Sequence, residues 1–144
     1  IYGGGKLGLM GTLSKTVKKF NGSITSVIPK ALNNKNIINQ NTDKVIVTKD
    51  ISSRKKYMIE KADLFIVLPG GMGTLDEAFE ILSLNGLNLI NKPVIFLDIK
   101  GYWQPLKRII LKAANEGFLN KNSNYNVSFI NSIDKTIEFI ERNM

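Results

Sequence analysis

A strand-like run that turns through glycines directly into a helix is the feature of this sequence that most restricts its fold. Residues 63–68 form a short segment that is continuously apolar after Asp63, which is typical of a parallel strand buried on both faces. Pro69-Gly70-Gly71-Met72-Gly73 follows, and residues 74–84 then carry apolar side chains at helical spacing. The first N–H groups of a helix lack intrahelical acceptors, and the helix dipole favours negative charge there. This junction therefore predicts an anion-binding, nucleotide-type site at the start of the helix.

The rest of the chain alternates strand-like and helical segments in the same way. This order predicts an α/β fold in which helices cover a parallel sheet. No internal repeat or linker interrupts the pattern, so we expect residues 1–144 to form a single domain. In open sheets of this kind, ligands bind beyond the carboxyl ends of the strands, near the point where strand order reverses. The expected strands are the end of one at 1–2, then 23–28, 44–48, 63–68, 94–97 and about 127–129, and the expected helices are 8–21, 53–62, one from 74, about 103–116 and one from about 132.

The absence of two residue types limits the chemistry. The 144 residues are 43% hydrophobic, enough for one sizeable core, and include no cysteine and no histidine. The sequence therefore has no disulfide, thiolate metal site, cysteine nucleophile, histidine ligand or histidine proton shuttle. Catalysis by this chain must rest on carboxylates, cations and backbone dipoles.

The formal charge of +8, from 20 Lys and Arg against 12 Asp and Glu, is the kind of balance that suits a polyanionic partner. The positive residues are scattered along several segments, however, and no aromatic residues are interleaved with them. A solvated surface is favoured over nucleic-acid binding. No apolar run is long enough to cross a bilayer and no secretory signal opens the chain, so we expect no membrane partner and a cytoplasmic location.

The first glycine motif lies at residues 3–8. It satisfies G-x-G-x-x-G between a strand and a helix, as a dinucleotide site requires. Such a site also needs an acidic residue roughly 20 positions later, and the first one here is Asp43, beyond a long loop. An NAD site is therefore disfavoured. A close-approach turn beside a ligand and a purely structural tight turn are equally good interpretations.

Three cations follow Ser52-Ser53 at the expected start of a helix. Arg54, Lys55 and Lys56 would then occupy a turn where the helix dipole prefers Asp or Glu. A break in a local rule is where function is expected, although exposed cations carry only a small cost there. We expect Arg54 to grip a phosphate or ribose oxygens bidentately, and Lys56 to point into water.

The second glycine motif has a structural explanation of its own. Thr74-Leu75-Asp76-Glu77 matches a capping box, in which Thr74 would cap the helix and Glu77 would reach back to its N–H. A capping box would account for Glu77 without any chemistry. It does not require the three glycines at 70, 71 and 73, which favour the site interpretation.

In order and spacing, these segments resemble the Lonely Guy (LOG) family. The specific part is Arg54-Lys55 followed by Pro-Gly-Gly-x-Gly-Thr-x-x-Glu at 69–77, and the resemblance extends to about Phe118. Its members are nucleoside 5′-monophosphate phosphoribohydrolases that release cytokinin bases from their ribotides, often labelled "possible lysine decarboxylase". That label conflicts with the absence of a pyridoxal-phosphate lysine motif. The other matching stretches are 1–5, 8–11, 27–29, Met58, 92–94, 101–103 and 116–118.

The resemblance implies a Rossmann-like, doubly wound fold, no metal or organic cofactor, a homodimer, and AMP or an N6-modified AMP as the small-molecule partner. By position it makes Arg54 and Glu77 the catalytic pair. A carboxylate near the anomeric carbon would stabilise positive charge on the ribose and orient water, and Asp76 is a candidate acid for the leaving base. The substrate-binding residues by the same reasoning are Gly4, Gly5, Lys55, Gly70, Gly71, Met72, Gly73, Thr74, Asp76 and Ser83.

The chain departs from the family pattern in three places. Family members open with a further strand and helix that these residues lack, so we expect the 144 residues to be a fragment or the ordered part of a longer protein. The acidic substrate contact of the family falls near Asn36 here, and its histidine before Arg-Lys is replaced near Ser52. Two other functions stay open, a non-catalytic nucleotide or cofactor carrier on the same fold and a basic nucleic-acid-associated module.

Overall fold

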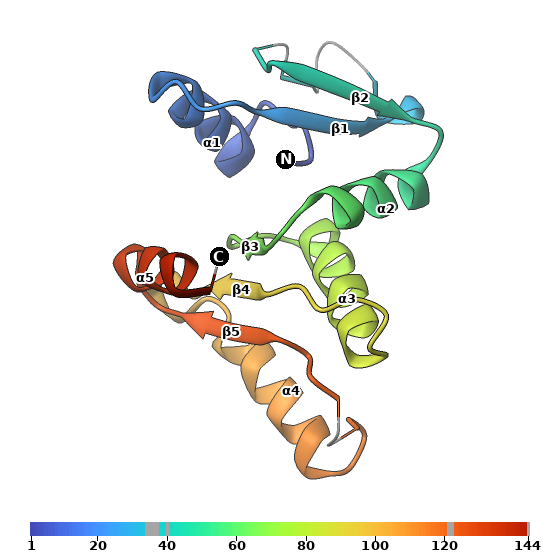
Figure 1. Cartoon of the computed structure of the whole chain (residues 1–144), viewed down its shortest axis with the longest axis vertical. Coiled ribbons are helices and arrows are strands. Elements are labelled where there is room, and N and C mark those ends of the chain that lie inside the picture. Colours follow the sequence, from blue (N-terminus) through green and yellow to red (C-terminus); the bar gives the residue numbers. More distant parts are fainter. Residues whose placement is uncertain (34–37, 40, 121–122, 144) are drawn as a thin grey trace. The chain divides into compact units, whose positions relative to one another are not determined.

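The computed structural model describes residues 1–33, 38–39, 41–120 and 123–143, which form two compact units (Figure 1). Unit 1 is Ile1–Ala62 and unit 2 is Asp63–Met144, and each is described by itself. The single domain expected from the sequence stays a prediction. Among the described residues, no helix has the length and apolar character needed to cross a membrane.

Unit 1 is built on two parallel strands, β1 (Thr25–Pro29) and β2 (Lys44–Thr48), shown side by side in Figure 1. Tyr2 extends this sheet on the other side of β1, because its N–H donates to the Thr25 carbonyl and its carbonyl accepts from the Val27 N–H, both at 3.0 Å. Helix α1 (Gly8–Lys19) connects Tyr2 to β1, and a short 3₁₀ turn, η1 (Lys30–Leu32), follows β1. Helix α2 (Ile51–Lys61) follows β2 and packs on both strands.

The core of unit 1 lies along β1. Val27 and Ile28 are fully or almost fully buried, as are Ile24 before the strand and Ile59 on α2. Residues 26–29 of β1 are all buried, Ser26 included, so this strand is covered on both faces. In β2, by contrast, Val45 and Val47 are exposed.

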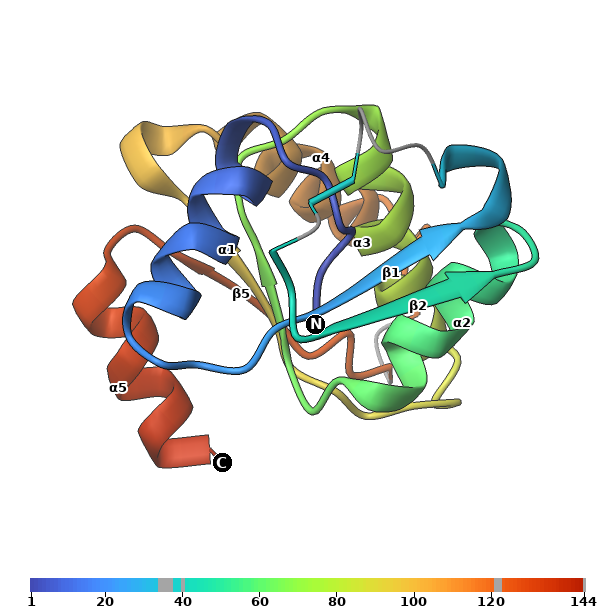
Figure 2. The ribbon, with the colours of Figure 1, turned by 90° about the horizontal axis from the view of Figure 1, so that it is seen from above.

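Unit 2 is a parallel sheet of β3 (Phe65–Val67), β4 (Val94–Leu97) and β5 (Val127–Ile130), in that spatial order. Helix α3 (Met72–Gly86) joins β3 to β4. The turn η2 (Ile99–Gly101) and helix α4 (Gln104–Asn115) join β4 to β5, and α5 (Ile133–Asn143) follows β5. Figure 2 shows α3 and α5 on opposite sides of these strands. Both faces of the sheet are thus covered, as a doubly wound arrangement requires.

The central strand β4 carries the core of unit 2. Val94, Ile95 and Phe96 have no exposed surface. The Phe96 ring stacks on Phe129 with centroids 4.9 Å apart and meets the edge of Trp103 at 5.2 Å. These contacts tie β4 to β5 and to the segment that begins α4, so the carboxyl ends of the strands are held by a packed aromatic cluster.

The predicted alternation of strands and helices is confirmed, and so is the α/β fold class. The strands at 44–48 and 94–97 have the predicted bounds, whereas β3 is shorter than the apolar run at 63–68. Two helices begin earlier than expected, α2 at Ile51 and α3 at Met72. The proposed absence of an N-terminal strand and helix stays a prediction.

Candidate functional site

The glycine turn of unit 1 leads from Tyr2 into α1, which is the predicted strand-to-helix context. Gly4 has φ +80°, and a Cβ there would lie 2.6 Å from Cγ1 of Ile28. Its carbonyl accepts from the Asn39 N–H at 2.8 Å, and Gly5 forms an antiparallel bridge with Ile38. Close packing inside the protein therefore accounts for Gly4 and supports the interpretation as a structural turn. Ligand contact through Gly4 and Gly5 stays a prediction.

Arg54 is held against the same turn. Its Nε donates to the Val27 carbonyl of β1 at 2.9 Å. Its terminal Nη2 lies 2.4 Å from the position that a Cβ on Gly3 would occupy. The absence of a side chain at Gly3 leaves the space that the guanidinium fills, so the structure brings the first two predicted segments together.

The three cations are not in the first turn of α2. The helix begins at Ile51, and the Asp50 carboxylate caps it by accepting from the Ser53 N–H at 2.7 Å. This cap lowers the pKa of Asp50, with the hydrogen bond from the Ser53 backbone as the largest cause. The expectation that Arg54, Lys55 and Lys56 oppose the dipole in a first turn was therefore wrong, because the N-cap lies four residues before Arg54.

Lys55 and Lys56 have different surroundings. Lys55 is half-buried, whereas Lys56 is exposed and lies 3.9 Å from Glu60, one turn further along α2. The prediction that Lys56 faces water is confirmed. The family contact expected near Asn36 lies outside the described residues, and Ser52 is exposed on the first turn of α2.

The glycine turn of unit 2 starts α3 without a side-chain cap. Gly71 is the N-cap residue, and its carbonyl accepts from the N–H groups of Thr74 and Leu75 at 3.0 and 3.1 Å. Thr74 thus lies inside the helix, so the capping box predicted from Thr74 and Glu77 was wrong. Helix geometry leaves the N–H groups of Met72 and Gly73 without intrahelical acceptors. Together with the dipole, they favour an anion at this end.

Two contacts fix the shape of this turn. A Cβ on Gly70 would lie 2.2 Å from Oγ1 of Thr74, so the threonine side chain sits where a residue other than glycine would project. The hydroxyl of Tyr102 donates to the Gly70 carbonyl at 2.7 Å. Tyr102 belongs to a stretch that resembles the family, but no role for it could be predicted from the sequence, because its contact joins residues 32 positions apart.

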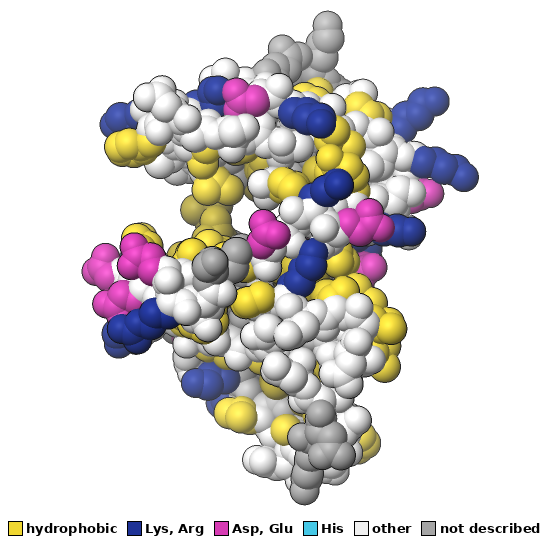
Figure 3. All heavy atoms as spheres, in the orientation of Figure 1, with side chains coloured by type: hydrophobic (Ala, Val, Ile, Leu, Met, Phe, Trp, Pro, Cys, Tyr) yellow, Lys and Arg dark blue, Asp and Glu magenta, His cyan; other side chains and the backbone are white. Residues whose placement is uncertain are grey.

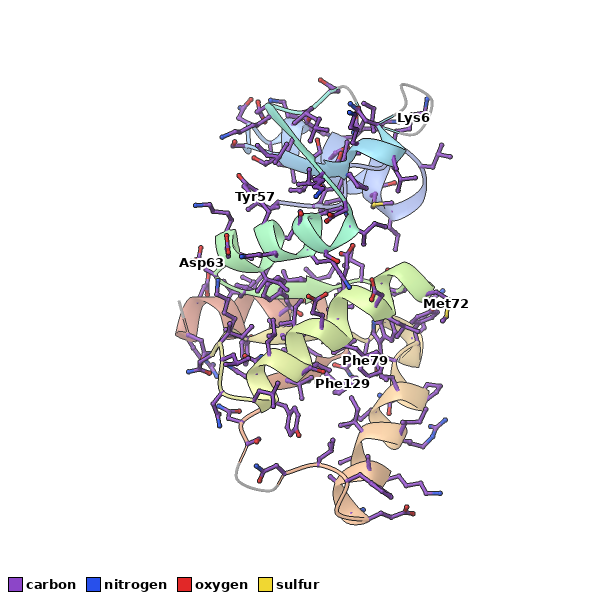
Figure 4. The ribbon with its side chains drawn as sticks, turned by 90° about the vertical axis from the view of Figure 1, so that its right-hand side faces the viewer. Lys6, Tyr57, Asp63, Met72, Phe79 and Phe129 are labelled. Carbon is purple, nitrogen blue, oxygen red and sulfur yellow. The ribbon has the colours of Figure 1, made fainter. Side chains whose placement is uncertain are left out.

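The predicted acidic residues follow the turn along α3. Asp76 is exposed and Glu77 is half-buried. Glu77 comes four residues after Gly73, so both lie on the same side of the helix, about 6 Å apart along its axis. Met72 is 81% exposed, and Figure 4 shows it at the outer end of α3. Ser83 is also exposed, about 9 Å further along the axis than Glu77, away from the turn.

The structure therefore groups the predicted site residues in two sets, one in each unit. In the unit 2 set, the N–H groups at the start of α3 can bind an anion, and the same helix carries the Glu77 carboxylate. The pairing of Arg54 with Glu77 stays a prediction. Among the described residues, no group of Asp and Glu side chains is arranged to hold a metal ion. The unit 1 set is Gly4, Gly5, Arg54 and Lys55, and the unit 2 set is Gly70, Gly71, Met72, Gly73, Thr74, Asp76, Glu77 and, further along, Ser83.

Comparison with known families gives a match over most of the chain. A family model described as "Possible lysine decarboxylase", which covers the LOG proteins, matches residues 10–140. The chain belongs to the LOG family. The resemblance predicted from Arg54-Lys55 and the 69–77 motif is confirmed.

Curated relatives in the LOG family carry a consistent name. The chain is 38% identical over 125 residues to cytokinin riboside 5′-monophosphate phosphoribohydrolase LOG5 of Arabidopsis thaliana, covering 87% of this chain and 55% of the relative. It is 36% identical over 143 residues to LOG1 of the same plant, covering 98% of this chain and 66% of that one. A probable phosphoribohydrolase of rice, LOGL1, is 40% identical over 119 residues, covering 83% of this chain and 53% of the rice protein. The chain thus spans about half to two thirds of the length of these relatives.

Solved structures have the same fold. The X-ray structure of TM1055, a structural genomics target, matches with a TM-score of 0.67 at 22% identity, covering 96% of this chain and 75% of that one. A molybdenum cofactor binding protein from the phototrophic bacterium Rippkaea orientalis matches with a TM-score of 0.65 at 27% identity, covering 97% and 74%. This fold thus occurs in a protein named for cofactor binding, whereas the curated relatives are named for hydrolysis, so the fold alone does not decide the function.

Proposed function

We propose that this chain hydrolyses the N-glycosidic bond of a purine nucleoside 5′-monophosphate, AMP or an N6-modified AMP, to the free base and ribose 5-phosphate. The relatives in the LOG family named above support this reaction. The observation that carries it is the start of α3, where an N-terminus capped only by Gly71 is followed within two turns by the half-buried Glu77. One helix thus offers a seat for the 5′-phosphate and a carboxylate for the sugar.

Glycosidic cleavage builds positive charge on the ribose ring as the bond between C1′ and the base nitrogen breaks. The carboxylate of Glu77 stabilises this charge and orients the water whose oxygen attaches to C1′. The bonding electrons leave with the base, which takes up a proton from Asp76, the proposed donor, and the proton that the attacking water loses restores Asp76 to its acid form. When residues 70–74 bind the phosphate, the sugar is held next to Glu77. Glu77 and the anomeric carbon then need not find each other by diffusion, which lowers the entropic part of the barrier.

Arg54 orients the ribotide or the departing base in this proposal. Its Nε donates to the Val27 carbonyl, which orients the guanidinium for the proposed contact with the ligand. Lys55, the next residue on α2, supplies a second cation near the nucleotide. The backbone of Gly4 and Gly5, together with Ser83 on α3, completes the proposed contacts.

The test is a panel of nucleotides with the purified full chain. AMP, N6-isopentenyl-AMP, GMP and CMP are incubated separately, and free base and ribose 5-phosphate are quantified by chromatography. We expect equal amounts of the two products from at least one purine nucleotide. If no nucleotide in the panel yields base, this proposal is wrong.

Assembly and location belong to the same proposal. We infer a homodimer in the cytoplasm, as the family resemblance implies. Exposed apolar side chains on α1, including Leu9, Met10 and Leu13, support burial against another copy. Light scattering on the purified chain should give twice the chain mass, and a monomeric mass at micromolar concentration would contradict the dimer.

A second candidate is a nucleotide or cofactor carrier without turnover. The likeness to the molybdenum cofactor binding protein favours it, because that protein has a similar fold and is named for binding a cofactor and not for hydrolysis. A carrier binds its ligand equally well with Glu77→Gln and releases no base. Tight AMP binding with no product in the panel would support the carrier and exclude the hydrolase.

A further inference from the structure

Tyr102 lies outside the predicted site set, but its side chain reaches the glycine turn of unit 2 by a hydrogen bond. It follows η2, after the carboxyl end of β4, and its hydroxyl donates to the Gly70 carbonyl at 2.7 Å. Its side chain is half exposed, so the bond lies at the surface where a ligand of the turn would bind.

A buried cluster supports Tyr102 from below. The Trp103 ring meets the Tyr102 ring edge-on, with centroids 4.8 Å apart, and meets Phe96 of β4 edge-on at 5.2 Å. The Asp98 carboxylate accepts from the backbone N–H of Trp103 at 2.6 Å and from the side-chain amide of Gln104. Asp98 and Trp103 are almost completely buried. These contacts restrict the position of the Tyr102 ring, although Tyr102 itself follows a turn.

The bond constrains more than one carbonyl. In a planar trans peptide, the C=O and the N–H of the same unit point in opposite directions. When Tyr102 holds the Gly70 carbonyl, it also turns the Gly71 N–H the other way. Gly71 is the N-cap of α3, so this N–H joins those of Met72 and Gly73 at the start of the helix. Thr74 holds the turn from its other side, in the space beside Gly70.

We propose that Tyr102 is the positioning residue for phosphate binding, and that its hydroxyl aligns the Gly70–Gly71 peptide so that the turn presents its N–H groups to the 5′-phosphate. This inference rests on the proposed function for the nature of the ligand. It concerns only the phosphate, so the contribution of Tyr102 is specific to phosphorylated ligands. A residue that merely stabilised unit 2 would affect phosphorylated and unphosphorylated ligands alike.

The variant is Tyr102→Phe, which removes the hydroxyl and keeps the ring against Trp103. Affinities for AMP, adenosine and ribose 5-phosphate are measured by calorimetry on the full chain. We expect the affinities for AMP and ribose 5-phosphate to fall about tenfold, because the released Gly70–Gly71 peptide no longer holds its N–H toward the charged phosphate, and one such hydrogen bond is worth about this factor. The affinity for adenosine should not change. In turnover, KM for AMP should rise by a similar factor with kcat nearly unchanged.

Tyr125→Phe is the matched control. Tyr125 packs its ring on Gly86 at the opposite end of α3, so removal of its hydroxyl should leave all three affinities as in the wild type. Equal losses for AMP and adenosine in Tyr102→Phe, or no loss for AMP, would overturn the positioning role. Absence of turnover in the wild type would overturn the proposed hydrolysis instead, and the binding comparison would still decide the role of Tyr102.

Discussion

The position of the Arg54 side chain is set by two residues that have no reactive or charged side chain, Val27 and Gly3. The Val27 carbonyl fixes Nε, and the bare backbone of Gly3 leaves room for Nη2. A guanidinium anchored on one edge keeps its other donors in a fixed plane, which is what bidentate contact with a nucleotide needs. Gly3 therefore belongs to the candidate site through Arg54.

A double-mutant cycle tests this dependence. Gly3→Ala places a methyl group in the volume of Nη2, so we expect kcat/KM for AMP to fall about tenfold because Arg54 is displaced. Arg54→Lys removes the planar group that the methyl group obstructs. In the Arg54→Lys background, Gly3→Ala should have little further effect on kcat/KM. Losses that simply add would show that Gly3 acts independently of Arg54.

Among the secondary-structure elements, α3 is anchored at its C-terminal end by Asn85. Its side chain is fully buried, donates to the Lys92 and Tyr125 carbonyls at 2.9 and 3.1 Å, and accepts from the Lys92 N–H at 3.0 Å. It therefore satisfies the backbone of the segments that lead into β4 and β5. This amide thus ties the C-terminal end of the helix that carries Glu77 to the segments before β4 and β5.

Asn85→Ala leaves these buried backbone groups unpaired. We expect a loss of about 3 kcal/mol in the free energy of unfolding, measured by urea denaturation. Ser83→Ala, an exposed change on the same helix, is the control and should alter it by less than about 0.5 kcal/mol. Equal stability of the two variants would contradict the anchoring role.

The cap of α2 gives a pH dependence. The pKa of Asp50 is lowered by the Ser53 hydrogen bonds, and that of Asp43 is lowered first by its hydrogen bond from Lys18. A carboxylate with a lowered folded-state pKa stabilises the fold at neutral pH, and this contribution is lost as pH falls through that pKa. Asp50→Asn keeps an acceptor for the cap but does not titrate. The thermal midpoint of Asp50→Asn should therefore fall less between pH 6 and pH 3 than that of the wild type, and parallel curves would contradict this.

The elements could be predicted where the local pattern was decisive. The segments at 44–48 and 94–97 contain the apolar β-formers 45–47 and 94–97, and both form strands with the predicted bounds. The helix starts were misplaced because Asp50 and Gly71 cap earlier than the polar residues that were taken as signals. The contact of Tyr102 with Gly70 and the seat of Arg54 on Gly3 join distant segments, so no local pattern contains them.

At the scale of the whole molecule, the charge of +8 is spread rather than gathered. Figure 3 shows Lys and Arg side chains on this face singly or in small groups among polar and apolar ones, and several lie near Asp or Glu. A continuous basic stripe would be needed for strong sequence-independent binding to nucleic acid. We therefore interpret the basic composition as a solvated surface, and the absence of a nucleic-acid partner stays a prediction.

Binding to a short DNA duplex and to single-stranded RNA tests this interpretation. We expect no binding tighter than about 10⁻⁴ M at physiological salt, the weak end of non-specific association. Fluorescence anisotropy over a range of salt concentrations is the measurement. Tight binding whose affinity falls steeply with salt would favour the nucleic-acid module over the nucleotide site.

Glu77→Gln tests the central claim most directly. The N-cap of α3 is Gly71 and not Thr74, so Glu77 is not part of a capping box. Glutamine keeps the size of the side chain and a hydrogen-bonding oxygen, so the thermal midpoint should change little. AMP binding should also persist, because the phosphate seat is intact. We predict that release of base from AMP falls about a hundredfold or more, since the charge that stabilises the ribosyl cation is gone. Turnover that stays within a few-fold of the wild type would contradict the account.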